Sequence, residues 1–87
     1  GSNIETLHRM LDDRVEALEF RIRQQSKVTD KPLMDLNLKK NLLICTIVRN
    51  GKIITPSGKD CIMNGDTVIV VTTNKGLTDI TDILDRA

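Results

Sequence analysis

Aromatic residues are almost absent from this sequence: Phe20 is the single aromatic among 87 residues, and neither Trp nor Tyr occurs. Proteins that bind single-stranded nucleic acids generally use aromatic side chains as stacking surfaces, and here 13 basic residues are balanced by 12 acidic ones. The sequence therefore argues against a nucleic-acid partner. The core must be built from Leu, Ile and Val. Because so short a chain buries only a small core, we expect a homodimer, in which association adds stability.

Residues that could perform catalysis or bind a metal are equally sparse. His8 is the only histidine, and Cys45 and Cys61 form no CxxC pair. We expect Cys45 to be a small buried side chain within a strand and both thiols to be reduced. Glu16 is expected on a solvent-exposed strand face, where no second titratable group converges with it. The sequence therefore predicts no catalytic residues, no metal site and no enzymatic activity.

Long apolar runs and a signal peptide are also missing. No stretch approaches the roughly 20 apolar residues that a membrane-spanning helix needs, and the N-terminus carries no secretion signal. These absences favour a cytoplasmic location. Gly1-Ser2 is typical of the remnant left by tag removal, which suggests a piece cut from a longer protein.

Two helices are predicted in the first half of the sequence, one on each side of a strand. Residues 4–11 place apolar side chains at helical spacing after Asn3, a good N-cap residue. Residues 15–23 alternate between apolar and charged side chains, as expected of a half-buried strand. After a polar connector, residues 32–38 begin with Pro32 and offer one or two helical turns.

Three strands and a last helix are predicted in the second half. The segment 42–49, LLICTIVR, is almost continuously apolar, which indicates a strand covered on both faces by its own domain or a partner chain. Residues 52–55, KIIT, are predicted to run back as the second strand, and residues 66–73 form the third. Residues 77–85 have the pattern of an amphipathic helix. The fold class is therefore α+β: a small, mainly antiparallel sheet with a short helix after its first strand and a C-terminal helix, preceded by an N-terminal helix.

The glycine-rich stretch 49–58, RNGKIITPSG, has two possible roles: a phosphate-binding loop or a β-hairpin turn. A phosphate loop leads into a helix N-terminus, where backbone N–H groups converge on the anion. Here Asn50-Gly51 leads into a strand-forming run, and this dipeptide is the strongest short signal for a two-residue hairpin. The sequence predicts a hairpin.

The segment 33–44 is the best candidate for a binding surface, and two interpretations of it remain open. Its aliphatic side chains could line an apolar groove with Lys39, Lys40 and Asn41 at the rim. Alternatively, the same side chains could pack the core and a twofold interface between two copies.

Several of these segments, in this order, resemble the TrkA C-terminal domain, also called the RCK C-terminal domain. The resemblance is carried by EALEFRI, KPLMDLNL, LLICTIVRNGKIITPSG and IMNGDTVIVV, and it covers roughly residues 14 to 73. It implies that residues 14–87 form a regulatory domain. Residues 1–13 would then be a tag remnant and the end of a linker helix from a missing N-terminal domain.

The resemblance also implies a function. Proteins of this family are cytosolic subunits, peripheral to the inner face of the membrane, that gate a potassium transporter. Their N-terminal domains, absent here, bind NAD(H) or ATP. The C-terminal domain dimerises, and in several members it binds cyclic di-AMP at the twofold interface. By resemblance, such a site comprises Leu33, Met34, Asn37, Leu38, Lys39, Leu43 and Ile44.

Two alternatives accompany this hypothesis. The domain could be a structural dimerisation unit that binds no ligand. It could also belong to a different parent, because similar modules occur on cation/proton antiporters and on some transcription regulators.

Overall fold

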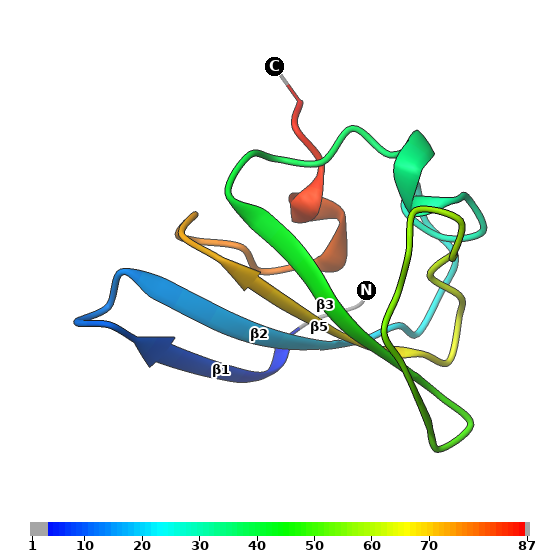
Figure 1. Cartoon of the computed structure of the whole chain (residues 1–87), viewed down its shortest axis with the longest axis horizontal. Helices are drawn as coiled ribbons and strands as arrows, with labels where there is room; N and C mark the ends of the chain where they lie inside the picture. Colours follow the sequence, from blue (N-terminus) through cyan, green and yellow to red (C-terminus); the bar gives the residue numbers. More distant parts are fainter. Residues whose placement is uncertain (1–3, 87) are drawn as a thin grey trace.

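The computed structural model describes residues 4–86, which form one five-stranded antiparallel sheet (Figure 1). Along the sheet the strands lie in the order β1-β2-β5-β3-β4. The elements are β1 (Ile4–Met10), β2 (Val15–Arg21), η1 (Leu33–Asp35), β3 (Leu42–Arg49), β4 (Lys52–Ile54), β5 (Thr67–Thr72) and η2 (Ile80–Ile83). The proposed tag remnant Gly1-Ser2 and the proposed cap Asn3 lie outside the described residues.

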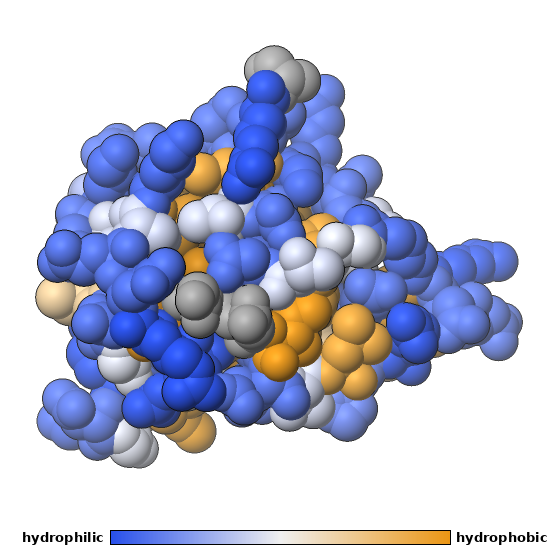
Figure 2. Space-filling view, turned by 180° about the vertical axis from the view of Figure 1, so that it is seen from behind, coloured by the Kyte–Doolittle hydropathy of each residue, from blue (hydrophilic) through white to orange (hydrophobic). Residues whose placement is uncertain are grey.

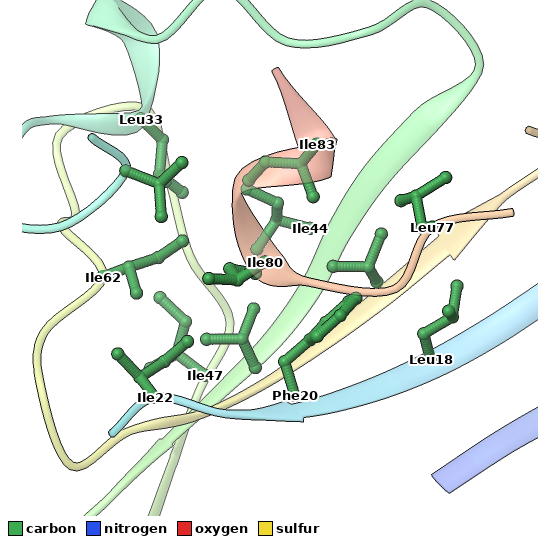
Figure 3. Packing of buried hydrophobic residues seen from close by; sticks show 13 residues of the cluster. Leu18, Phe20, Ile22, Leu33, Ile44, Ile47, Ile62, Leu77, Ile80 and Ile83 are labelled. Carbon is green, nitrogen blue, oxygen red and sulfur yellow. The ribbon is translucent and has the colours of Figure 1, made fainter. Parts of the chain in front are cut away.

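The core lies on one face of this sheet. Alternate side chains of β2 and β5, such as Phe20 and Val68, point to that face and are fully buried. The loop segments and η2 close over them, so that Leu33, Ile62 and Ile80 pack against the strands (Figure 3). The core is aliphatic around a single ring, as the composition requires.

The predicted N-terminal helix is wrong, because residues 4–10 form the edge strand β1. A bulge between Ile4 and Thr6 adds one residue to the strand. Ile4 therefore lies opposite Phe20 and Leu7 opposite Leu18, both on the core face. Two apolar residues three positions apart share a face, which is the spacing that suggested a helix.

The tight turn after β1 explains why the chain reverses here. Leu11, Asp12 and Asp13 all have positive φ values, of 54, 56 and 66°. Aspartate adopts this left-handed conformation more readily than most residues. The two carboxylates, which follow the segment 4–11 predicted as a helix, belong to a hairpin loop.

The other two predicted helices are single 3₁₀ turns, so the α+β fold class is also wrong for residues 4–86. Residues 32–38 contain only η1. In the C-terminal segment, Leu77, Ile80 and Ile83 are buried at a spacing of three, which matches a 3₁₀ turn. Asp79 accepts hydrogen bonds from the backbone N–H and hydroxyl of Thr81, which favours a turn over a longer helix.

The predicted hairpin is confirmed. Asn50 and Gly51 have φ values of 51 and 76° and connect β3 to β4, with Arg49 paired to Lys52. Both residues have a left-handed backbone conformation, as a two-residue type I′ turn requires, and the twist of this turn matches that of the flanking strands. The stretch 49–58 is therefore a turn followed by a loop, without the helix that a phosphate loop would need.

An ion pair between Arg49 and Asp66 joins the end of β3 to the loop that leads into β5. Arg49 Nε and Nη2 donate to the two oxygens of Asp66, both at 2.9 Å. Arg49 Nη2 also donates to the Cys61 carbonyl at 2.8 Å, and Asp66 Oδ2 accepts the Met63 N–H at 2.8 Å. The hydrogen bond with Asp66 raises the pKa of Arg49 above its ordinary value against the opposing effect of burial, so the guanidinium stays charged.

Removing the Asp66 carboxylate should destabilise the fold strongly. We expect Asp66→Ala to lower the free energy of unfolding by about 3 kcal/mol, because it leaves Arg49 and the Met63 N–H without their acceptor. Chemical denaturation measures this loss. The control Glu19→Ala removes a half-buried carboxylate from the other face of β2 and should change stability by less than about 1 kcal/mol. Equal losses in both variants would contradict the role given to the pair.

Candidate ligand site

The seven residues predicted as a ligand site lie in four places within one chain. Leu33 and Ile44 are buried in the core. Met34 and Leu43 are each 62% exposed, one beside Gly58 and the other on the outward side of β3. The remaining three residues lie together in an extended segment: Asn37, Leu38 and Lys39. That two copies of the chain bring these seven residues together in one site at a twofold interface stays a prediction.

The extended segment 37–39 is fixed by pairing with the C-terminal residues. The Lys39 N–H donates to the Ile83 carbonyl and the Asp85 N–H donates to the Asn37 carbonyl, both at 2.8 Å. The Asn37 side chain adds a third bond, from Nδ2 to the Asp85 carbonyl at 3.2 Å. The amide of Asn37 therefore holds the C-terminal segment in place.

Lys39 lies close enough to Asp82 to affect its ionisation. Burial pushes the pKa of Asp82 up, but three hydrogen bonds, from the N–H groups of Thr78 and Asp79 and from the Thr78 hydroxyl, act the other way. Together with the charge of Lys39, they hold the pKa of Asp82 below its ordinary value. The charge of Lys39 therefore already interacts with a carboxylate of its own chain.

A cavity of about 740 Å³ opens beside this pairing. We call it the loop cavity; its lining comes from residues 26–27, 31, 35–37, 81 and 84–86. Leu36 and Leu84, both half-buried against the core, form its apolar floor. Charged side chains surround the floor: Lys27, Lys31, Arg86, Asp35 and Asp85. Asn37 is the one member of the predicted site that lines this cavity.

The opposite face of the sheet carries apolar side chains that are not buried. We call it the outer sheet face. The strand register places these residues there: Met10, Val15, Ala17, Leu43, Val48, Ile53, Ile69 and Val71. None of them is buried, and Ile53 is 78% exposed. Within the described residues, β3 is therefore covered on one face only, and coverage of both faces by a partner stays a prediction.

Exposed hydrophobic side chains are also visible from another direction. The view from behind shows a surface that is mostly polar, with hydrophobic patches between the charged side chains (Figure 2). Isolated patches of this kind are normal on folded proteins, so they carry less weight than the apolar side chains that gather on the outer sheet face.

Two expectations about single side chains are wrong. Cys45 is exposed, because a bulge between Ile44 and Thr46 turns it away from the core. Glu16 is buried, since it lies on the same face as Leu18, and it forms ion pairs with Arg9 at 3.6 Å and Lys75 at 3.9 Å. The parity of β2 could have placed Glu16 on the core face, whereas nothing in the sequence marks the bulge.

His8 lies exposed on β1, opposite Ala17. Among residues 4–86, no three His, Cys, Asp or Glu side chains come together in a way that could hold a metal ion. Within the same residues, no helix has the length and apolar character needed to cross a bilayer.

The family model of the TrkA-C domain matches residues 17–85, which is most of the chain and includes every element of the described fold except β1 and the start of β2. The chain belongs to the TrkA-C domain family. The resemblance noted in the sequence is thereby confirmed, and its extent reaches beyond the last strand to the C-terminal 3₁₀ turn.

Known proteins similar to this TrkA-C chain are potassium uptake proteins by name. The "Trk system potassium uptake protein TrkA homolog 2" of Methanosarcina mazei is 31% identical over 80% of this chain and 16% of its own length. The TrkA homolog of Pyrococcus abyssi is 31% identical over 82% of this chain and 32% of its own. TrkA of Azorhizobium caulinodans is 33% identical over 77% of this chain and 15% of its own length. The chain thus spans less than a third of each relative.

The lowered pKa of Asp82 makes stability depend on pH. A carboxylate whose pKa is lower in the folded state stabilises the fold above its unfolded pKa, and this contribution is lost as pH falls through the folded value. We expect the melting temperature to fall below about pH 4, and to fall less steeply in Asp82→Asn. Melts at several pH values measure both slopes.

The control Asp13→Asn changes an exposed turn carboxylate and should retain the wild-type slope. Identical slopes in wild type and Asp82→Asn would show that Asp82 does not contribute to acid sensitivity.

Proposed function

We propose that this chain is the regulatory module of a Trk-type potassium uptake system. In this proposal it is cytoplasmic, peripheral to the inner face of the membrane in the full-length assembly, and homodimeric. It senses a small ligand and acts on a membrane transporter subunit without catalysing a reaction. The family match across residues 17–85, to relatives that are named for potassium uptake, carries the proposal.

The outer sheet face supports the homodimer. One face of an antiparallel sheet commonly meets water, and it then carries polar side chains. Here that face carries Val15, Leu43 and Val71 where β2 and β3 begin and β5 ends, and none is buried. A second copy laid against this face would remove these side chains from water, at about 25 cal/mol for each Å² of apolar surface covered.

Ligand control of such a dimer is a linkage effect. A ligand that binds one dimer geometry more tightly than another shifts the equilibrium by the difference in its binding free energies. The transporter then responds to the geometry rather than to the ligand itself. Cyclic di-AMP remains the first candidate ligand, and NAD(H) or ATP belongs to the preceding domain in this proposal.

A charge placed among these apolar side chains of the outer sheet face should separate the dimer. We expect the wild-type chain to sediment as a dimer and Leu43→Lys as a monomer, because an ammonium group would be desolvated in the interface. Analytical ultracentrifugation measures both. Met63→Lys, which alters an exposed apolar residue in the loop before β5, should remain dimeric. A monomeric wild-type chain would refute the homodimer.

Thermal melts with cyclic di-AMP separate a sensor from a purely structural dimerisation domain. A ligand at a hundredfold excess over its Kd stabilises by ~2.7 kcal/mol, and a chain of this size shifts by ~4–8 °C per kcal/mol. We therefore expect a rise of about ten degrees or more. If only protein concentration changes the midpoint, sensing of cyclic di-AMP by this chain is ruled out, and the domain acts as an assembly unit with respect to this nucleotide.

A further inference from the structure

We propose that the loop cavity binds a small phosphate monoester that carries hydroxyl groups. The cavity lies within a single chain, on the side of the sheet that is covered by the core. It is therefore separate from the outer sheet face, and this inference does not depend on the proposed function.

The cavity is large enough and already formed. Its volume of about 740 Å³ falls within the range of small-molecule sites, ~300–1,000 Å³. Three hydrogen bonds hold the residues 37–39 against residues 83–85, so that the Leu36 and Leu84 floor is fixed before any ligand arrives. A preformed site saves the cost of ordering its walls on binding.

The cations of the cavity are available to an anion. Among residues 4–86, neither Lys27 nor Lys31 has a hydrogen bond or ion pair, and both are exposed. Arg86 donates to the Thr81 carbonyl at 3.3 Å and lies 3.8 Å from Asp82, but its side chain is 65% exposed. Exposed ion pairs are weak, so Arg86 can turn toward a bound phosphate. Lysines bind phosphate as point charges.

The two carboxylates of the cavity narrow the class of ligand. Asp35 and Asp85 line the same space as the cations. An ionised carboxylate only accepts hydrogen bonds, so these groups fit hydroxyl donors and repel a second phosphate. Three cations against two carboxylates leave a formal charge of +1, which suits a single phosphate group. The combination selects a hydroxylated monophosphate over a polyphosphate.

No aromatic side chain is available to stack a nucleobase, because Phe20, the single aromatic, is completely buried. Without stacking, the cavity recognises only a phosphate, several hydroxyl groups and a ring that packs on Leu36 and Leu84. A sugar phosphate and a nucleoside monophosphate both supply these features. Comparing glucose 6-phosphate with AMP distinguishes these two sources.

The test is an NMR titration of the isotope-labelled 87-residue chain at low ionic strength with glucose 6-phosphate, AMP and inorganic phosphate. We expect saturable binding of at least one ester, with shifted amide resonances in residues 26–31, 35–37 and 81–86. The double variant Lys27→Gln/Lys31→Gln should bind that ester about tenfold more weakly. The matched control Lys52→Gln/Lys59→Gln removes the same charge from two exposed lysines elsewhere and should bind like wild type.

Three results would overturn the proposal. The first is the absence of saturable binding by both esters. The second is an equal loss of affinity in the two double variants, which would indicate a general charge effect. The third is equally tight binding of inorganic phosphate, which would indicate an adventitious ion only. All four lysines are exposed, so we expect both double variants to melt at the wild-type midpoint, and this removes misfolding as an explanation.

Discussion

The Arg49–Asp66 pair is the contact on which the arrangement of the second half of the chain depends. Asp66 is 1% exposed and stands just before β5, while Arg49 ends β3. Twelve residues separate β4 from β5 without regular structure, and the pair holds this loop through the Cys61 carbonyl and the Met63 N–H. A buried carboxylate without its partner would cost several kcal/mol. The loop therefore has one favourable path, which brings Ile62 into the core and starts β5 in register between β2 and β3.

The elements that the sequence predicts correctly are those whose signals are local. Alternation identified β2, the apolar run identified β3, and Asn50-Gly51 identified the hairpin because its two residues must adopt positive φ. The helices failed for an equally local reason. A β-bulge places Ile4 and Leu7 on one face at a spacing of three, and a 3₁₀ turn does the same for Ile80 and Ile83. Both spacings are nearly those of an α-helix, so periodicity alone cannot separate the three cases in short segments.

The candidate site was harder to predict, because its geometry depends on contacts between distant residues. Asn37 meets Asp85 only after the C-terminal segment has returned across the core. The sequence therefore marks 33–44 as a surface of interest and leaves core packing open as the alternative, but it does not single out Leu33 and Ile44 as the members that are buried. Similarly, Lys27 and Arg86 are unremarkable charges in the sequence, and they line one cavity only because the loop after β2 and the C-terminal segment lie beside each other in the fold.

The two surfaces of this small domain are connected by one short piece of chain. Asn37 lines the loop cavity at the start of the segment 37–39, and three residues after this segment Leu42 and Leu43 begin β3, where Leu43 lies on the outer sheet face. A ligand that tightens the pairing between 37–39 and 83–85 would favour one position of the start of β3 over others. If that position differs between monomer and dimer, binding and association are coupled, and each must strengthen the other by the same factor. The core between the two surfaces consists of aliphatic side chains around the single ring of Phe20. Close packing of its aliphatic side chains would then transmit even a small displacement.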